Sequence, residues 1–451
     1  MGRLRRFLRI CVTMGVIALI VFPAISFAEV SYDKYTPTWK YPKAFQPGEA
    51  NRQNRQQFML RILEQPIRPF GYGIGETAEW VERHHIDKKT IWFFDELSER
   101  GIHPKMRISQ SKGTGPALEL ELDKLFKFTN EYFSLKTFEG AGVIPNDSGL
   151  SYDFGGSYRL NLPPEIPTYQ ETVIYYDRKT SQNFFGIGQN TSLGDWSTYA
   201  PEELKLNTLM GVKPTEQIEG KMGFVFQHMN IGNGRRERVG KIKEHFMNAD
   251  IPGISGGDLI GLETSVAHDT RDHQDDPKKG GIQKLQFGYF HDVDSNDFQY
   301  LQFQGSLAHF FSLGSDRRVL ALRFHLEKDQ DVGNGNIPFY NLPRLGGVTS
   351  GQESELLRSY RHNRFIEKGL MLADLEYRYS IWEYGDCGAD AFLLTDVGEV
   401  FKEFSGFGFE ELKGSYGGGM NIKFRRKTVL TIVWAAGNEG SRLSMQTKAS
   451  F

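Results

Sequence analysis

The stretch Leu320-Ala321-Leu322-Arg323-Phe324-His325-Leu326-Glu327 places a large apolar side chain at every second position. Successive side chains of a β-strand point to opposite faces, so the large apolar residues would share one face and Arg323, His325 and Glu327 the other. Residues 118–123 and 373–380 alternate in the same way. These patterns predict β-strands with one apolar and one polar face.

Two classes of β-protein have such strands. In a soluble sandwich the polar face meets water, whereas in an outer-membrane barrel the apolar face meets lipid and the polar face lines the lumen. Alternation does not separate the two classes, but strand length does. Strands of soluble sheets have ~5–6 residues, and tilted strands that cross a bilayer need ~9–11. Most runs in this chain are of the longer kind, which favours the barrel.

The number and spacing of the runs support this prediction. Strands are expected near residues 105–111, 116–126, 129–138, 149–161, 169–178, 200–213, 217–230, 257–270, 280–291, 297–311, 317–328, 367–380, 388–398, 412–425, 427–437 and 442–451. Connections such as 313–316 and 384–386 are short, and those on the opposite side, such as 231–256 and 329–366, are long. An even strand number with short periplasmic turns and long outer loops is typical of outer-membrane barrels. We therefore predict an all-β fold, a sixteen-stranded antiparallel transmembrane β-barrel.

Composition excludes several classes of protein. The 54 Lys and Arg nearly balance the 56 Asp and Glu, so no nucleic-acid partner is indicated. Hydrophobic residues make up 39% of the chain, and only one stretch, at the N-terminus, approaches the ~20 apolar residues of a membrane-spanning helix. A multi-span helical membrane protein is therefore excluded.

Residues 1–28 have the features of a signal peptide. Arginines between residues 3 and 9 form a basic start, Cys11–Ile25 an apolar core, and Ser26-Phe27-Ala28 a small-x-small cleavage site. The alternative, an uncleaved anchor, is disfavoured by that site. Cleavage leaves Cys387 as the only cysteine of the exported chain, so no intramolecular disulfide is expected.

Residues 29–104 are expected to form a periplasmic lead-in before the barrel. Within it, Thr77–Arg83 and Thr90–Leu97 have the spacing of two short amphipathic helices. The barrel domain, residues 105–451, ends in Phe451, an aromatic terminus typical of the last strand of such barrels.

No motif supports catalysis or metal binding. Gly253-Ile254-Ser255-Gly256-Gly257 matches the G-x-S-x-G nucleophile elbow, but the elbow needs a helix after the serine, and here a strand follows. The aspartates between residues 269 and 276 are offset by Arg271 and nearby lysines, so a solvated turn is favoured over a Ca²⁺ site. We predict no enzyme activity, no cofactor, and no catalytic, cofactor-binding or metal-binding residues.

The turn after residue 268 carries a family resemblance. Asp269, Arg271 and Asp272, followed by Pro277 and Gly280, resemble the D-x-R-D…P-x-x-G turn of the BamA/TamA-type bacterial surface antigen family of outer-membrane β-barrels. Two further pieces follow in the family's order. They are Gly346-Gly347 and then Leu357-Arg358-Ser359-Tyr360, which resembles the (V/L)-R-G-(F/Y) motif of its long sixth outer loop.

The chain departs from that family in two places. Ser359 stands where the loop motif has Gly, so a less tight loop tip is expected. Residues 29–104 are only about long enough for one periplasmic POTRA domain and lack its strands. Delivery of substrates by POTRA repeats is therefore not expected.

The resemblance implies a function in the bacterial outer membrane. It implies outer-membrane protein assembly, membrane biogenesis or protein translocation, with outer-membrane lipid and client outer-membrane or secreted polypeptides as partners. The alternative is a passive outer-membrane channel. A lipid-cleaving enzyme would need a Ser-His-acid set, for which no spacing in the chain provides support.

A loop latch is the candidate site. The resemblance implies that the 329–366 loop folds into the lumen, with Arg358 at its tip. Strand alternation places Glu376 and Asp396 on the lumen face of consecutive strands joined by a short turn. A guanidinium can bridge two carboxylates, so we predict that Arg358 binds Glu376 and Asp396.

Overall fold

The computed structural model describes residues 96, 102–108, 116–122, 133–143, 149–162, 168–247, 249–295, 297–348, 356–384, 386–404, 408 and 411–446. For the segments between 102 and 143 it describes the backbone alone. The expected signal peptide, most of the lead-in and Phe451 lie outside the described residues. Glu96, in the second expected helix, is helical.

Strands make up most of the described chain. They are β1 (Ile102–Ile108), β2 (Pro116–Leu122), β3 (Phe133–Val143), β4 (Leu150–Asn161), β5 (Thr168–Arg178), β6 (Gln182–Phe184), β7 (Ser197–Val212), β8 (Ile218–Asn233), β9 (Gly240–Lys241), β10 (Gly256–Asp269), β11 (Gly280–Asp292), β12 (Gln299–Ser312), β13 (Arg318–Asp331), β14 (Arg344–Leu345), β15 (Phe365–Ile366), β16 (Gly369–Tyr384), β17 (Cys387–Phe401), β18 (Lys413–Phe424), β19 (Lys427–Gly437) and β20 (Gly440–Gln446). Two short helical elements, η2 (Leu193–Asp195) and α5 (Ile242–His245), lie in the connections. None of the helices that the structure describes has the length and apolar character needed to cross a membrane.

The long strands pair in the order of the sequence. One sheet of 18 strands contains the antiparallel succession β1, β2, β3, β4, β5, β7, β8, β10, β11, β12, β13, β16, β17, β18, β19, β20. The short strands β6 and β9 add to one end of β7, and β14 pairs with β15 in a separate two-stranded sheet.

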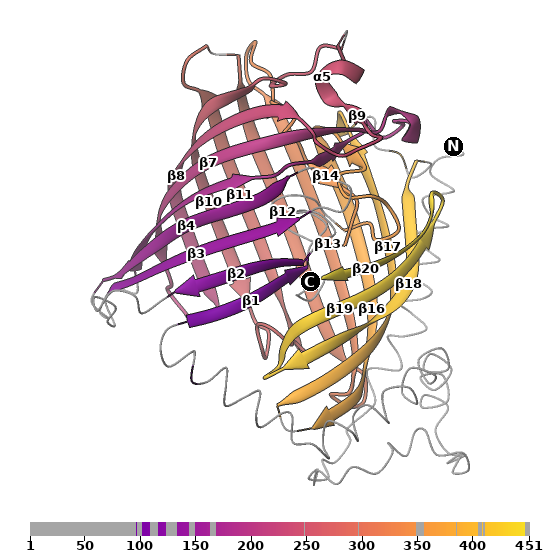
Figure 1. The fold of residues 1–451 in the computed structure, drawn as a ribbon. Coiled ribbons are helices and arrows are strands. Elements are labelled where there is room, and N and C mark those ends of the chain that lie inside the picture. Colours follow the sequence, from indigo (N-terminus) through magenta and orange to yellow (C-terminus); the bar gives the residue numbers. More distant parts are fainter. Residues whose placement is uncertain are drawn as a thin grey trace, which may run out of the picture.

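The sheet curls round on itself (Figure 1). Its first and last strands, β1 and β20, come into contact, although no backbone pairing joins them among the described residues. The longer connections, including the one that carries α5, lie at one end, which we call the outer end. We call the opposite end, where the short turns lie, the periplasmic end.

The two faces of the sheet differ in how far their side chains are exposed. On β8, Phe224 is 68% exposed on the convex face, while the next residue, Val225, is 3% exposed on the concave face. Apolar side chains are exposed on the convex face along most of the sheet: Phe154, Ile174, Leu206, Met222, Ile260, Leu285, Phe303, Leu322, Trp434 and Leu443. Strand alternation therefore places an exposed apolar belt on the convex face, while the concave face carries both polar side chains and buried apolar ones such as Val225.

Every strand expected from the sequence overlaps a strand of the structure, but several ends differ. β7 begins at Ser197, β16 continues to Tyr384 and β17 to Phe401. Ladder hydrogen bonds use backbone groups, so pairing continues past the last alternating side chain. β1 likewise begins at Ile102, inside the expected lead-in.

Candidate functional site

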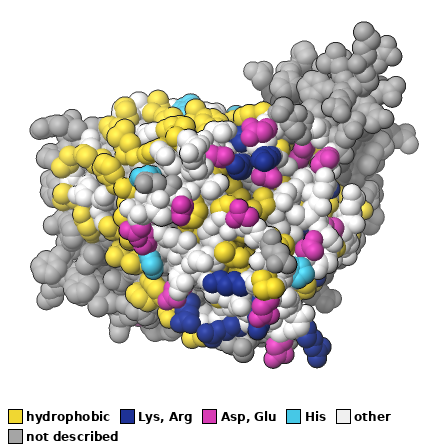
Figure 2. Space-filling view, turned by 90° about the horizontal axis from the view of Figure 1, so that it is seen from above, with side chains coloured by type: hydrophobic (Ala, Val, Ile, Leu, Met, Phe, Trp, Pro, Cys, Tyr) yellow, Lys and Arg dark blue, Asp and Glu magenta, His cyan; other side chains and the backbone are white. Residues whose placement is uncertain are grey.

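Of the loop between β13 and β16 (residues 332–368), the described parts, 332–348 and 356–368, fold into the space that the sheet encloses. Its Phe339 is fully buried and packs edge-on against Tyr199 of β7, with ring centroids 5.1 Å apart. Tyr340 and Leu342 belong to the same buried cluster as Tyr300 of β12. Figure 2 looks onto the outer end of the molecule, where packed side chains fill the centre. The described parts of the loop thus occupy the outer part of the lumen.

Two motif glycines shape this loop. Gly346 and Gly347 have φ angles of +127° and +103°, a region that favours glycine. A Cβ atom on Gly346 would lie 2.3 Å from the carbonyl oxygen of Arg361. The Leu357 N–H donates to the Gly347 carbonyl at 3.1 Å, which brings the two motif segments together beside Arg358.

Arg358 contacts both predicted carboxylates. Its Nε lies 3.1 and 3.0 Å from the two Asp396 oxygens, and its backbone N–H donates to Asp396 Oδ2 at 3.1 Å. Its Nη1 is paired with Glu376 Oε1. The side chains of Arg358 and Asp396 are 0% exposed and that of Glu376 is 1% exposed. We call these three residues the latch.

Opposite charges make this burial tolerable. Burial lowers the pKa of the Arg358 guanidinium, but the Asp396 and Glu376 carboxylates outweigh that effect and raise it above its ordinary value. Glu376 also accepts a hydrogen bond from Arg378 Nε at 2.8 Å. The loop tip is therefore held by a buried, charge-paired network, which removal of one member would leave unbalanced.

Ser359 makes a second contact with the wall of the lumen. Its N–H donates to Ser415 Oγ of β18 at 3.0 Å, and the two hydroxyl oxygens are 2.7 Å apart. A Cβ atom on Gly437 of β19 would lie 2.4 Å from Ser359 Oγ. The expectation of a less tight tip is therefore wrong, because Ser415 binds the serine and Gly437 leaves room for it.

The remaining motif residues pack the loop in place. Leu357 and Tyr360 are buried in a cluster with Leu345, Leu370 and Leu372. Beyond the motif, Arg364 Nε binds both oxygens of Glu439, at 2.8 and 3.0 Å, and its guanidinium carbon lies 4.9 Å from the centre of the Phe185 ring. The loop thus contacts wall residues of several strands and the 179–196 connection.

The D-x-R-D turn has its own internal contacts. Arg271 donates to Asp269 through Nε at 2.9 Å and Nη2 at 2.7 Å. Asp272 Oδ1 accepts from the N–H groups of Lys278 and Lys279. Gly280 has φ +82°, and a Cβ atom there would lie 2.0 Å from the Thr270 carbonyl oxygen. The motif residues therefore fix the shape of the turn.

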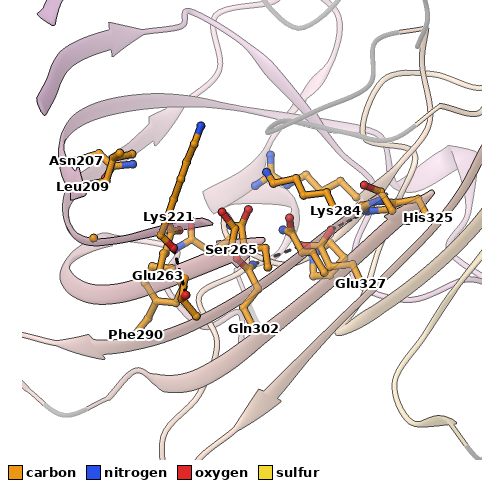
Figure 3. A pocket seen from close by; sticks show the side chains of 18 of the residues that line it. Asn207, Leu209, Lys221, Glu263, Ser265, Lys284, Phe290, Gln302, His325 and Glu327 are labelled. Carbon is orange, nitrogen blue, oxygen red and sulfur yellow. Dashed lines mark hydrogen bonds and ion pairs between the residues drawn. The ribbon is translucent and has the colours of Figure 1, made fainter. Parts of the chain in front are cut away.

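A cavity of about 690 Å³ lies in the lumen below the 332–368 loop. Figure 3 shows side chains of several strands around it, among them Lys221, Glu263, Lys284, Gln302 and Glu327. Gln302 and Gln304 both donate to Glu327 Oε1, at 3.4 and 2.7 Å. The cavity is lined by charges of both signs.

The structure provides no catalytic set around Ser255. This serine is exposed in the turn before β10, and none of the described histidines hydrogen-bonds to it. Within the part of the chain that is described, no group of three or more His, Cys, Asp and Glu side chains is placed to hold a metal ion.

Several site residues were not predicted from the sequence. Arg378 stands two positions after Glu376, so strand alternation could have placed both on the lumen face. Ser415, Gly437 and Glu439 meet the loop only because the sheet curls. No local pattern marks those three residues.

Comparisons with known proteins agree with this geometry. The family model described as the Omp85 superfamily domain matches residues 126–424. BamA from Haemophilus ducreyi lacking POTRA domains 1–3 is similar in structure, with a TM-score of 0.53 and 14% identity over 76% of this chain and 68% of that one. CdiB from Escherichia coli has a TM-score of 0.50 and 11% identity, over 77% of this chain and 62% of that one. No curated protein matches the sequence.

Proposed function

This chain belongs to the Omp85 superfamily, and from that membership we propose that it assembles outer-membrane proteins or translocates polypeptides across the outer membrane. The predicted resemblance to BamA/TamA-type barrels is confirmed, and the protein is an outer-membrane β-barrel protein of bacteria. The observation that carries the proposal is the buried Arg358, which holds a folded loop inside the lumen.

We propose that the barrel closes between β1 and β20. Without the short β6 and β9, the 18-stranded sheet has sixteen strands in antiparallel succession. An even number and contact between the end strands fit a closed transmembrane barrel. The apolar convex face would then meet lipid, and a closed barrel leaves no sheet edge unpaired in the bilayer.

The filled lumen favours transport or assembly over free diffusion. Phe339, Leu342 and Tyr360 of the loop are buried, and a passive pore gains nothing from such a plug. Clients and lipid are then the partners, and no covalent chemistry is required. Only one observation, the polar lining of the cavity, favours the competing pore function.

Reconstitution in liposomes tests the proposal. Purified protein is inserted into liposomes, and an unfolded eight-stranded outer-membrane protein is added as the client. We expect folded, protease-protected client to accumulate faster than with empty liposomes. Equal rates in both samples, together with steady and uniform conductance in planar bilayers, would support the pore instead.

A further inference from the structure

The turn between β10 and β11 contacts the far side of the sheet. Asp276, in the middle of the turn, lies 3.3 Å from Lys423 Nζ, near the periplasmic end of β18. Five strands, β11, β12, β13, β16 and β17, separate β10 from β18 in the sheet.

Lys423 points into the lumen. Its side chain is 5% exposed, and its ammonium group also lies 2.7 Å from Asp390 on the concave face of β17. The turn therefore crosses the periplasmic mouth of the lumen to meet it. The expectation of a solvated turn is wrong for Asp276, whose side chain is only 13% exposed.

Further ion pairs fasten the same turn. They are Asp275 with Lys427 at 3.7 Å, Lys278 with Glu383 at 3.4 Å, and Lys279 with Asp316 at 3.1 Å. Asp275 and Asp276 face basic residues at the β18–β19 end, and Lys278 and Lys279 face acidic residues of β16 and the β12–β13 turn. Burial raises the pKa of Asp316, but the Lys279 ammonium and Ser312 hydroxyl outweigh it and lower that pKa below its ordinary value.

The hairpin between β18 and β19 adds an independent observation. Arg425 and Arg426 have φ angles of +48° and +62°, in a type of turn that normally contains Asn or Gly. Arg425 Nε donates to Asp386 at 3.2 Å, and Arg426 Nη2 donates to the Asp276 carbonyl at 3.3 Å. This unfavourable backbone is retained where an arginine side chain reaches the turn.

We propose that residues 270–279 form a strap that closes the periplasmic mouth of the lumen and can be released. The D-x-R-D motif and Gly280 fix its shape, and the charges at 275–279 hold it to the opposite wall. The pairs of Lys279 with Asp316 and of Asp275 with Lys427 are about half exposed, so these two are weak and screened by salt. The strap can therefore detach without breaking the sheet.

Crosslinking tests the closed position. Asp275→Cys and Lys427→Cys are combined in a Cys387→Ser background and treated with a short bifunctional maleimide. We expect an intramolecular crosslink in the folded protein that changes the mobility of the boiled band, and none in either single-cysteine variant. Absence of the crosslink in folded protein would overturn the closed strap.

Labelling of the cavity tests the closure itself. Ser306→Cys, which lines the cavity, is introduced into the Cys387→Ser background and reacted with a polyethylene glycol maleimide. Asp276→Lys places a cation against Lys423 and Arg426, so we expect the labelling rate to rise severalfold. Asp294→Lys, the same charge change at an exposed outer turn, is the matched control and should leave the rate unchanged.

Unchanged labelling in Asp276→Lys, with the heat-modifiable band retained, would show that the strap does not gate the cavity. A rise in both variants would trace the effect to net charge and would also overturn the proposal. Neither readout depends on a client, so the proposed function and the strap can fail separately.

Discussion

At the scale of single residues, the latch concentrates charge at a buried site. Arg358 is fully buried and pairs with two carboxylates from adjacent strands, β16 and β17. Burying three charges is costly unless each is paired and hydrogen-bonded. A planar guanidinium presents a rigid fork of N–H donors to both carboxylates at once, a geometry that the compact ammonium group of lysine does not reproduce.

Replacing Arg358 by alanine should loosen the barrel. Two buried carboxylates would lose their shared partner, at a cost of about 3–5 kcal/mol. We expect a lower midpoint of the heat-induced band shift in SDS gels after a fixed heating time. Arg358→Lys should recover only part of the loss, and a midpoint equal to wild type in the alanine variant would contradict the latch.

The serine pair should make a smaller contribution. Ser415→Ala leaves the buried Ser359 N–H without its acceptor, which should cost about 1–3 kcal/mol in stability. The same gel midpoint reports the loss. Ser255→Ala removes a hydroxyl from an exposed turn and is the control that should behave as wild type. Loss of an esterase activity in that control would revive the enzyme hypothesis.

At the scale of elements, the 332–368 loop depends on its backbone at Gly346. The left-handed φ there turns the chain so that Leu345 pairs with Phe365 while Gly347 meets Leu357. These backbone contacts orient Arg358 toward Glu376 and Asp396 in the wall of the lumen. The described parts of the loop thus form a folded element.

Alanine at Gly346 should disrupt this element. The new methyl group would lie 2.3 Å from the Arg361 carbonyl oxygen and would clash with it. The positive φ would add a backbone cost of about 1–3 kcal/mol for a residue other than glycine. Protease cleavage of the loop in folded protein should accelerate, and the gel midpoint should fall. Gly333→Ala is the matched control, since its φ is +61° and a Cβ atom there meets nothing within 4 Å. Equal effects in both variants would mean that crowding at Gly346 is unimportant.

At the scale of the whole molecule, the two faces of the sheet have different roles. The convex face exposes apolar side chains such as Phe224 and Leu285, and the concave face carries the latch, the cavity and the contacts of the strap. Alternation along each strand separates the lipid-facing surface from the functional interior.

A charge introduced on the convex face should therefore destabilise the barrel in lipid, whereas the same charge on the concave face should not. Phe224→Arg places a cation in the apolar belt, and we expect about 2–4 kcal/mol of destabilisation in lipid. Asn207→Arg is the matched control, because Asn207 pairs with Val225 at the same level but lines the cavity. Refolding yields into lipid vesicles should fall for the first variant only. Similar yields for both would argue against a lipid-facing belt.

The sequence by itself determined the strands and their faces, and together with the family resemblance it predicted the partners of Arg358. Alternation is a property of neighbouring residues, so Glu376 and Asp396 could be placed on the lumen face from β16 and β17 alone. The curl of the sheet decided the rest. It brings Ser359 to Ser415, Arg364 to Glu439, and Asp276 to Lys423, 147 residues away. Such contacts depend on the curvature accumulated over many strands. The local pattern of side chains does not predict that curvature.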